Sequence, residues 1–331
     1  MQVNSAGHLP GEAAQSFAEA CRRVELVERR AGRSVPCRES RLAVTRAYLD
    51  LEAAFFRADR ERVLGEDDLR ADIEVARAAA GPWLMRSYAV YLATTQRNGY
   101  PGDFQTIEAM YDLEPAAGFN AFQGPIANCV DGLFAHTSST PALWWRRRAF
   151  ADLVANAFKS DGTARILDVA CGGARYIQDA LNQAGDPDAE IVLLDQDPAA
   201  IAFCEHRVFP GRSNIRYINH PIGKVTNLDL GGQFDLIIVS GLFDYLADDP
   251  ARALLAHLSG RMNPGGLLAM TNFSLDDRSS PGWRWLLGWE LLLRTEQDVA
   301  GLFPDSVDVV TEVQAAGSMI FATATNPRDQ Q

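Results

Sequence analysis

The sequence lacks long hydrophobic runs and basic character, and each absence excludes a class of protein. No apolar stretch reaches the roughly 18 residues that a membrane-spanning helix needs. The net charge is −12, which disfavours a polyanionic nucleic acid as partner. The densest basic run, residues 146–148, fits one solvated face of a helix. We therefore expect a small-molecule substrate, with neither a nucleic acid nor a membrane as partner. The oligomeric state stays open.

Metal-ligand and disulfide patterns are also missing. The five cysteines are scattered and none forms a C-x-x-C pair, and the five histidines show no ligand spacing. Residues 1–15 lack the basic start and apolar centre of a secretory signal. These observations predict reduced thiols, no metal site and a cytoplasmic location.

The sequence changes character about halfway along its 331 residues. Before residue 160, apolar residues recur at three- and four-residue steps, which predicts helices over 13–30, 39–64 and 66–80. After it, short apolar runs alternate with helical patterns, as in a parallel sheet. We predict a helical cap over 1–159 and an α/β domain over 160–331.

The α/β part begins with a strand, a turn of small residues and a helix. A short apolar run ends at Asp168, residues 170–174 carry almost no side chain, and a helical pattern starts at Arg175. Such a turn lets the backbone approach a ligand at the N-terminus of a helix. A second buried strand ends at Asp195, where βαβ nucleotide sites hold a ribose. Capping of the next helix is the alternative role for Asp195, although Asp197 is better placed for it.

These two segments, LDVACGGARY and VLLDQDPAA, resemble the S-adenosylmethionine (SAM) site of the class I methyltransferases. In that family an acidic residue precedes G-x-G-x-G, and here Ala170, Gly172 and Ala174 occupy the glycine positions. Asp168 argues against the nicotinamide pattern. The resemblance implies a Rossmann-like fold with a seven-stranded sheet and SAM as cofactor. It also implies cofactor contacts from Asp168, Ala170, Gly172, Gly173 and Asp195.

Later strands place further residues at the same edge of the sheet. Strands are predicted at 215–219, 234–240 and 266–272, followed by a hairpin over 307–325. Ligands of open α/β sheets bind beyond the carboxyl ends of the strands. By resemblance, Asn219 or His220 takes the adenine position, where the family commonly has an acid. Ser240 and Phe243 would face the cofactor. Asp244 is a candidate base, with a helix cap and an exposed acid as alternatives.

The helical part contains a turn, Asn98 to Asp103, that concentrates polar and aromatic residues. Its glycine-tyrosine-x-glycine-aspartate segment resembles the bacterial enzymes that make 3-hydroxy fatty acid methyl esters. That resemblance implies that Tyr100 and Asp103 line the active site, whereas a simple connection between helices is the alternative. A second loop is predicted over 119–140.

Tyr176 lies where the glycine turn meets its helix, and its ring could stabilise the SAM sulfonium by cation–π attraction. Packing within the helix layer is the alternative. The family resemblance makes methyl transfer to a small carboxylate- or hydroxyl-bearing metabolite of secondary metabolism or signalling the leading hypothesis. No strong acid–base constellation is present, which is compatible with a reaction that has no second substrate. A capped class I fold is also similar to the azetidine-2-carboxylate synthases, which cyclise SAM and release methylthioadenosine. A non-catalytic SAM-binding protein is the third possibility.

Overall fold

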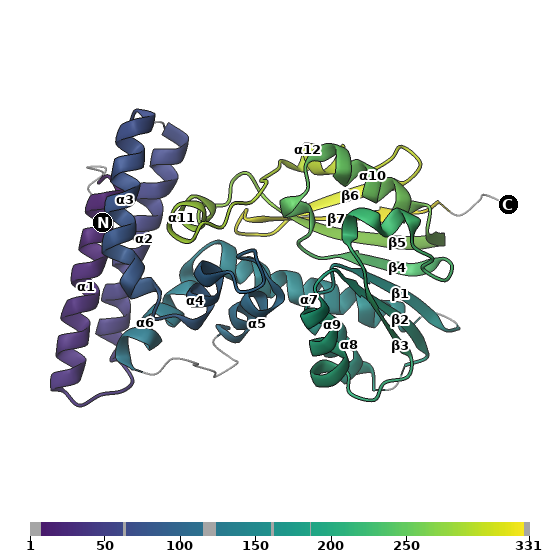
Figure 1. Cartoon of the computed structure of the whole chain (residues 1–331), viewed down its shortest axis with the longest axis horizontal. Coiled ribbons are helices and arrows are strands. Elements are labelled where there is room, and N and C mark those ends of the chain that lie inside the picture. The colour runs from purple at the N-terminus through teal and green to yellow at the C-terminus, as the bar shows by residue number, and fades with distance from the viewer. Residues whose placement is uncertain (1–7, 62–63, 115–123, 160–161, 186, 328–331) are drawn as a thin grey trace. The chain divides into compact units, whose positions relative to one another are not determined.

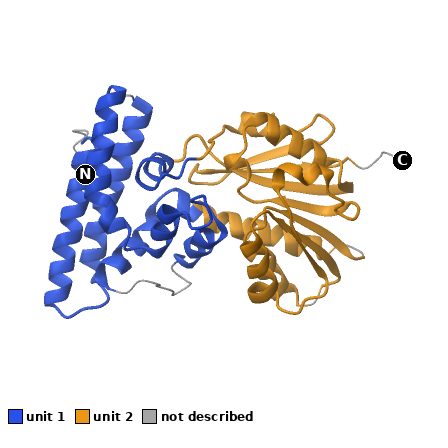
Figure 2. Cartoon of the chain, viewed as in Figure 1, with its two compact units in different colours: residues 1–141, 278–290 blue, residues 142–277, 291–331 orange. Residues whose placement is uncertain are grey.

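The computed structural model describes residues 8–61, 64–114, 124–159, 162–185 and 187–327. The chain divides into two compact units (Figure 2). Unit 1 comprises residues 1–141 and 278–290, and unit 2 comprises residues 142–277 and 291–331. A segment that lies beyond the fifth strand in sequence is therefore part of the helical unit.

Unit 1 is helical in its described part, and its long helices bury one face each. In α1, Phe17, Cys21 and Val24 are fully or almost fully buried at helical spacing, and the Phe17 ring packs edge-on against Tyr48 of α2 at 5.7 Å. The predicted first three helices are present. The helices of this unit are α1 (Pro10–Arg30), α2 (Arg38–Glu61), α3 (Glu66–Leu84), α4 (Tyr88–Thr95), α5 (Phe104–Asp112), α6 (Pro125–Leu133), η1 (Phe134–His136), α11 (Ser280–Gly282) and η5 (Trp283–Leu287).

Helix α6 corrects the prediction of a loop over 119–140. The first part of that interval, 119–123, lies outside the described residues, whereas Pro125–Leu133 is helical. The helix packs against α2 and buries Ile126, Val130 and Leu133. Its stability comes from this packing, because nine residues are too few for a helix that stands alone.

The segment 278–290 joins unit 1 through specific contacts with α2. The Ser279 hydroxyl donates a hydrogen bond to the Glu52 carboxylate, and Arg284 pairs with Asp59. The ring of Trp285 packs against Phe55 at 5.5 Å.

Unit 2 contains a seven-stranded sheet in the order β3-β2-β1-β4-β5-β7-β6 (Figure 1). Strands β1 to β5 are parallel, whereas β7 is antiparallel to both of its neighbours. The predicted seven-stranded Rossmann-like sheet is confirmed. The strands are β1 (Ala164–Val169), β2 (Ala189–Asp195), β3 (Ile215–Asn219), β4 (Phe234–Val239), β5 (Met262–Phe273), β6 (Asp308–Val313) and β7 (Met319–Thr325).

Helices cover both faces of this sheet, as Figure 1 shows. One face packs under α7 (Ser139–Ala157), α8 (Arg175–Ala184) and α9 (Pro198–Phe203), with Ile166, Ile238 and Ala269 in its core. The other face packs under α10 (Asp248–Ser259) and α12 (Glu296–Ala300), with Leu167, Val239 and Met270 in its core. The remaining short helical segments of unit 2 are η2 (Cys204–Val208), η3 (Ile222–Asn227) and η4 (Phe243–Tyr245).

The unit boundary lies earlier in the chain than the predicted division at 159/160. Most of α7 belongs to unit 2, because Phe150 and Val154 are buried in the core beneath the sheet. The predicted cap of residues 1–159 therefore differs from unit 1 at α7 and at 278–290.

Candidate functional site

The small-residue turn after β1 has a backbone that few side chains tolerate. Ala170, Gly172 and Ala174 have φ angles of 57°, 52° and 46°. This left-handed region costs an L-residue roughly 1–2 kcal/mol but suits glycine. The two alanines thus adopt the conformation that glycines have in a G-x-G-x-G turn, and Ala174 leads directly into α8. Two of the three non-glycine residues with positive φ among the described residues therefore lie in the turn where ligand binding is predicted, and the third is Gln96.

Asp195 holds this turn against the end of β2. Its Oδ2 accepts a hydrogen bond from the Gly172 N–H at 2.9 Å, and its Oδ1 accepts one from the Asp197 N–H at 2.8 Å. Burial raises the pKa of the Asp195 carboxyl, and backbone hydrogen bonds from Asp197, Gly172 and Gln196 counteract that rise. Asp197 caps α9 by accepting from the Ala199 N–H.

Asp168 and Tyr176 form a buried pair beneath the turn. The Tyr176 hydroxyl lies 2.8 Å from both carboxylate oxygens of Asp168. Burial raises the pKa of Asp168 to about 8, against the lowering effect of that hydrogen bond. The Tyr176 ring is 3% exposed and packs against Phe150 at 5.2 Å. The packing role of Tyr176 is therefore present in the structure, and its cation–π role stays a prediction.

Asn219 and His220 follow β3 and fix the loop beyond β2. The Asn219 Nδ2 donates to the carbonyl oxygens of Asp195 and Gln196, both at 3.0 Å. The His220 N–H donates to the Asp195 carbonyl, and its ring Nε2 lies 3.3 Å from the Lys224 carbonyl. Both residues thus lie beside Asp195, where the adenine position is predicted.

The loop after β4 carries Ser240, Phe243 and Asp244. Phe243 is fully buried in the core, and Asp244 is 2% exposed. The Asp244 Oδ1 accepts from the Phe273 N–H at 2.6 Å, which ties the loop to the end of β5. Burial raises the Asp244 pKa to about 7, while Arg146 and Arg294 lower it. An exposed acid is thereby excluded, and the role as base stays a prediction.

Arg294 holds this loop through hydrogen bonds, and no sequence pattern predicted this role. Its guanidinium donates to the Phe243 and Leu246 carbonyls at 2.7 and 2.6 Å and to Asn272 Oδ1 at 2.7 Å, and it pairs with Asp248 at 2.9 Å. Because Arg294 lies far along the chain from its partners, no local pattern indicates it.

The two cap candidates belong to unit 1. Asp103 is 1% exposed and accepts a hydrogen bond from the Thr106 N–H at 2.8 Å, so it caps α5. Tyr100 is half-buried in the turn before that helix. The structure therefore gives Asp103 a helix-capping role, and contact with a ligand stays a prediction for both residues.

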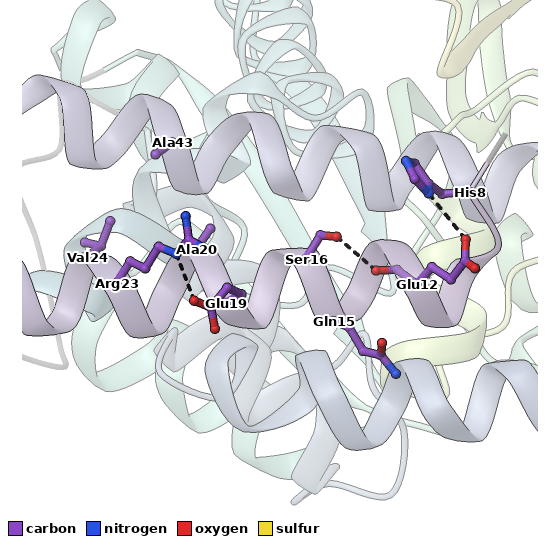
Figure 3. Close-up of a pocket in the computed structure, with 9 residues that line it drawn as sticks. All are labelled: His8, Glu12, Gln15, Ser16, Glu19, Ala20, Arg23, Val24 and Ala43. Atoms are coloured by element: carbon purple, nitrogen blue, oxygen red, sulfur yellow. Dashed lines mark hydrogen bonds and ion pairs between the residues drawn. The ribbon is translucent and has the colours of Figure 1, made fainter. Parts of the chain in front are cut away.

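Two surface clefts lie away from these residues. One, of about 720 Å³, runs along α1 and is lined by side chains that pair with one another, as His8 does with Glu12 and Arg23 with Glu19 (Figure 3). The other, of about 620 Å³, lies around Arg165, Glu190 and Asn214 near the amino ends of β1 to β3. In parallel sheets ligands bind at the opposite, carboxyl ends, so neither cleft carries a functional argument.

Comparison with known proteins identifies the type of domain. Residues 167–268, from β1 into β5, match the family model described as a methyltransferase domain. This part of unit 2 is therefore similar to a methyltransferase domain. This confirms the predicted class I methyltransferase type. Among curated proteins, none matches the chain.

Solved structures resemble both the whole chain and this domain. A possible exported protein from Bordetella parapertussis aligns over 99% of this chain and 100% of its own, with 15% identity and a TM-score of 0.57. The N-methyltransferase NodS from Bradyrhizobium japonicum, in complex with S-adenosylhomocysteine, aligns over 68% of this chain and 98% of its own, with 17% identity and a TM-score of 0.43. The first similarity shows that the fold recurs over the full length, including the helical unit. No helix in the described part of the chain is both long and apolar enough to cross a membrane.

Proposed function

We propose that the methyltransferase domain binds SAM at the turn after β1. The observation that supports the proposal is the hydrogen bond from the Gly172 N–H to the Asp195 carboxylate, because it joins the turn of small residues to the acid that we propose as the ribose acceptor. SAM has no phosphate, so its recognition depends on hydrogen bonds to the ribose, adenine and methionine groups. The small side chains of the turn, such as those of Ala170 and Ala174, leave its backbone open to a close approach by the cofactor.

The reaction that we propose is methyl transfer to a small carboxylate- or hydroxyl-bearing metabolite of secondary metabolism or signalling. The SAM sulfonium is permanently cationic, and transfer needs a nucleophile in line with the S–CH3 bond, so positioning supplies much of the rate. A carboxylate acceptor needs no base. A hydroxyl acceptor does, and Asp244, with a pKa raised to about 7, is the candidate.

Cyclisation of SAM is a second candidate, because it needs no second substrate and the sequence carries no strong acid–base constellation. In that reaction the α-amine attacks the γ-carbon, the C–S bond breaks, and methylthioadenosine leaves with the electron pair. The amine must first lose its proton to solvent, because Asp168 is fully buried against the Tyr176 hydroxyl and its raised pKa of about 8 keeps it largely protonated at neutral pH.

One experiment separates these reactions. The purified protein is incubated with SAM alone, and the products are analysed by mass spectrometry. Under the methyl-transfer proposal SAM stays intact until a carboxylic acid or alcohol is added, and S-adenosylhomocysteine then appears. Enzyme-dependent methylthioadenosine with an azetidine amino acid would instead establish the cyclase. Binding without turnover under either condition would contradict both and indicate a non-catalytic SAM-binding protein.

A further inference from the structure

The end of the helical unit where α1 leads into α2 is basic, although the chain as a whole is acidic. Residues 22–46 contain eight arginines and three glutamates, whereas the net charge of the chain is −12. All eight arginines are exposed. Positive charge is therefore concentrated on one solvent-facing part of the helical unit, residues 22–46, which we call the basic end.

Ion pairs within the helical unit balance only part of this charge. Glutamates of α1 pair with Arg22, Arg23, Arg29 and Arg33. The other four arginines of the basic end form no ion pair with a described residue: Arg30, Arg38, Arg41 and Arg46. Their guanidinium groups can therefore bind carboxylates from outside the chain.

The helix dipoles account for some of these arginines and not for others. A dipole favours cations in the last turn of a helix, where Arg29 and Arg30 of α1 lie, and anions in the first turn. Arg38 is the first residue of α2 and Arg41 the fourth, so both lie where a cation is disfavoured. Their charge does not stabilise α2, which favours a role outside the helix.

Aliphatic side chains are exposed between the arginines. Leu26 is 50% exposed, and it lies four residues after one arginine of α1 and four before another. Leu42 of α2 is 41% exposed and has the same spacing to arginines. Residues four apart share a helix face, so each helix presents a leucine between two guanidinium groups. Arginine with apolar side chains is typical of the surfaces by which proteins bind one another.

A buried carboxylate holds the two helices of the basic end together. Glu28 is fully buried, and its Oε1 accepts hydrogen bonds from the Ser40 hydroxyl at 2.6 Å and from the Cys37 N–H at 3.0 Å. These bonds join the last turn of α1 to the start of α2. The arginines are thus carried on a fixed backbone, and a binding partner does not have to order it.

The opposite end of the same helices is acidic. Helix α3 begins at the end away from the connection between α1 and α2 (Figure 1). The Asp72 Oδ2 accepts a hydrogen bond from the Gly11 N–H at 2.8 Å, which places the first turns of α3 beside the start of α1. Residues 66–75, which we call the acidic end, contain five acids and one arginine, and Val75 among them is 44% exposed.

The two ends together make the helical unit complementary to a reversed copy of itself. In the described part of unit 1, all the large apolar side chains that are strongly exposed lie in the basic end or the acidic end. From Gly11, beside the acidic end, to Leu26 of the basic end, α1 rises about 22 Å. Charges of opposite sign at this separation match when a second copy runs in the opposite direction.

We propose that a second copy of this chain binds the helical unit in antiparallel orientation, with the basic end of each copy against the acidic end of the other. The arginines then pair with carboxylates through charge-assisted hydrogen bonds, and the exposed leucines contact Val75 of the other copy. The two contacts are equivalent, so the assembly closes as a twofold dimer. A parallel orientation is disfavoured because it brings like charges together.

Sedimentation velocity of the full-length protein tests this dimer with paired charge reversals. The basic-reversed variant carries Arg30→Glu and Arg38→Glu, and the acidic-reversed variant carries Asp67→Lys and Asp68→Lys. All four residues are exposed, and none forms an ion pair with a described residue. Thermal unfolding shows whether each variant is folded, and the salt dependence of the wild type needs no variant.

The control variant reverses two exposed cations of unit 2, Lys159→Glu and Arg207→Glu. It changes the net charge as much as the basic-reversed variant does. It therefore separates the loss of a specific contact from a general repulsion between more acidic molecules.

We expect the wild type to sediment as a dimer whose Kd rises at least about tenfold between about 50 and 500 mM NaCl. Each reversed variant alone should be monomeric at concentrations at which the wild type and the control are dimeric. An equimolar mixture of the two reversed variants should restore the dimer, because each contact then joins opposite charges again.

Several results would overturn the proposal. A wild type that is monomeric at the lower salt concentration has no such contact, and a dimer that survives both reversals has its interface elsewhere. A mixture that stays monomeric, or a control that is also monomeric, shows that the two ends do not recognise each other. Wild-type species larger than a dimer indicate open head-to-tail chains instead. Because SAM is absent from these experiments, the proposed function does not depend on their outcome.

Discussion

At the scale of single residues, the Asp195 carboxylate accepts a hydrogen bond from the turn after β1, and we propose that it also accepts one from the ribose of SAM. Asp195→Asn keeps one acceptor oxygen, but it introduces an amide where a ribose hydroxyl or a backbone N–H must donate. We expect SAM affinity to fall about tenfold, or roughly 1.4 kcal/mol. Isothermal titration measures this.

Asp197 provides the control for that substitution. It caps α9 but makes no contact with the turn in the hydrogen bonds described. Asp197→Ala should cost about 1 kcal/mol of stability and leave SAM affinity unchanged. Equal losses of affinity in both variants would remove the ribose role of Asp195.

Asp168 makes the stability of unit 2 depend on pH. Its pKa in the folded protein, about 8, exceeds the roughly 3.9 of an unfolded aspartate. Between these values the folded state binds more protons, so the free energy of unfolding decreases as pH rises from 4 to 8. Asp244, with a folded pKa of about 7, adds a decrease of the same sign.

Urea unfolding at several pH values tests this dependence. Asp168→Asn stays neutral at every pH, and it should flatten the decrease between about pH 4 and 8. Its amide still accepts from the Tyr176 hydroxyl, which limits the loss of structure. A slope identical to that of the wild type would show that Asp168 does not titrate in this range.

At the scale of elements, Arg294 joins the loop after β4 to the end of β5. It is 5% exposed, and Arg294→Met would leave the buried carbonyls of Phe243 and Leu246 without their donor. Hydrogen bonds to charged groups contribute about 1.5–3 kcal/mol each, so we expect a loss of about 2–3 kcal/mol in chemical denaturation.

Arg252→Ala is the comparison for Arg294. Arg252 pairs with Asp248 and Asp249, but its side chain is 51% exposed. Exposed pairs contribute little, so its removal should change the free energy of unfolding by less than about 0.5 kcal/mol. Comparable losses for the two arginines would contradict the anchoring role of Arg294.

The elements that the sequence predicted best are those whose signals are local. The β1 turn and the end of β2 carry their information within a few residues, as small side chains and as an acid after an apolar run. Helix α6 was missed because its stability depends on packing against α2. Arg294 and the burial of Asp244 were missed because contacts between residues far apart in the chain decide them.

At the scale of the whole molecule, two segments decide which residues belong to each compact unit. Most of helix α7 packs on the sheet, although the sequence predicted it within the cap of residues 1–159, and residues 278–290 pack on α2 although they lie between strands of unit 2 in sequence. Amphipathic periodicity shows that a helix buries a face without showing which core it joins. For that reason the sequence predicted two domains but misplaced their boundary.

The central claim is that unit 2 is a SAM-binding methyltransferase domain organised around Gly172 and Asp195. Isothermal titration of the full-length protein with SAM tests it most directly, before any acceptor is known. We predict one site per chain with a Kd of about 10 µM or tighter, near −7 kcal/mol, and a clear loss of affinity in Asp195→Asn. No binding of SAM or S-adenosylhomocysteine to the folded protein would contradict the account.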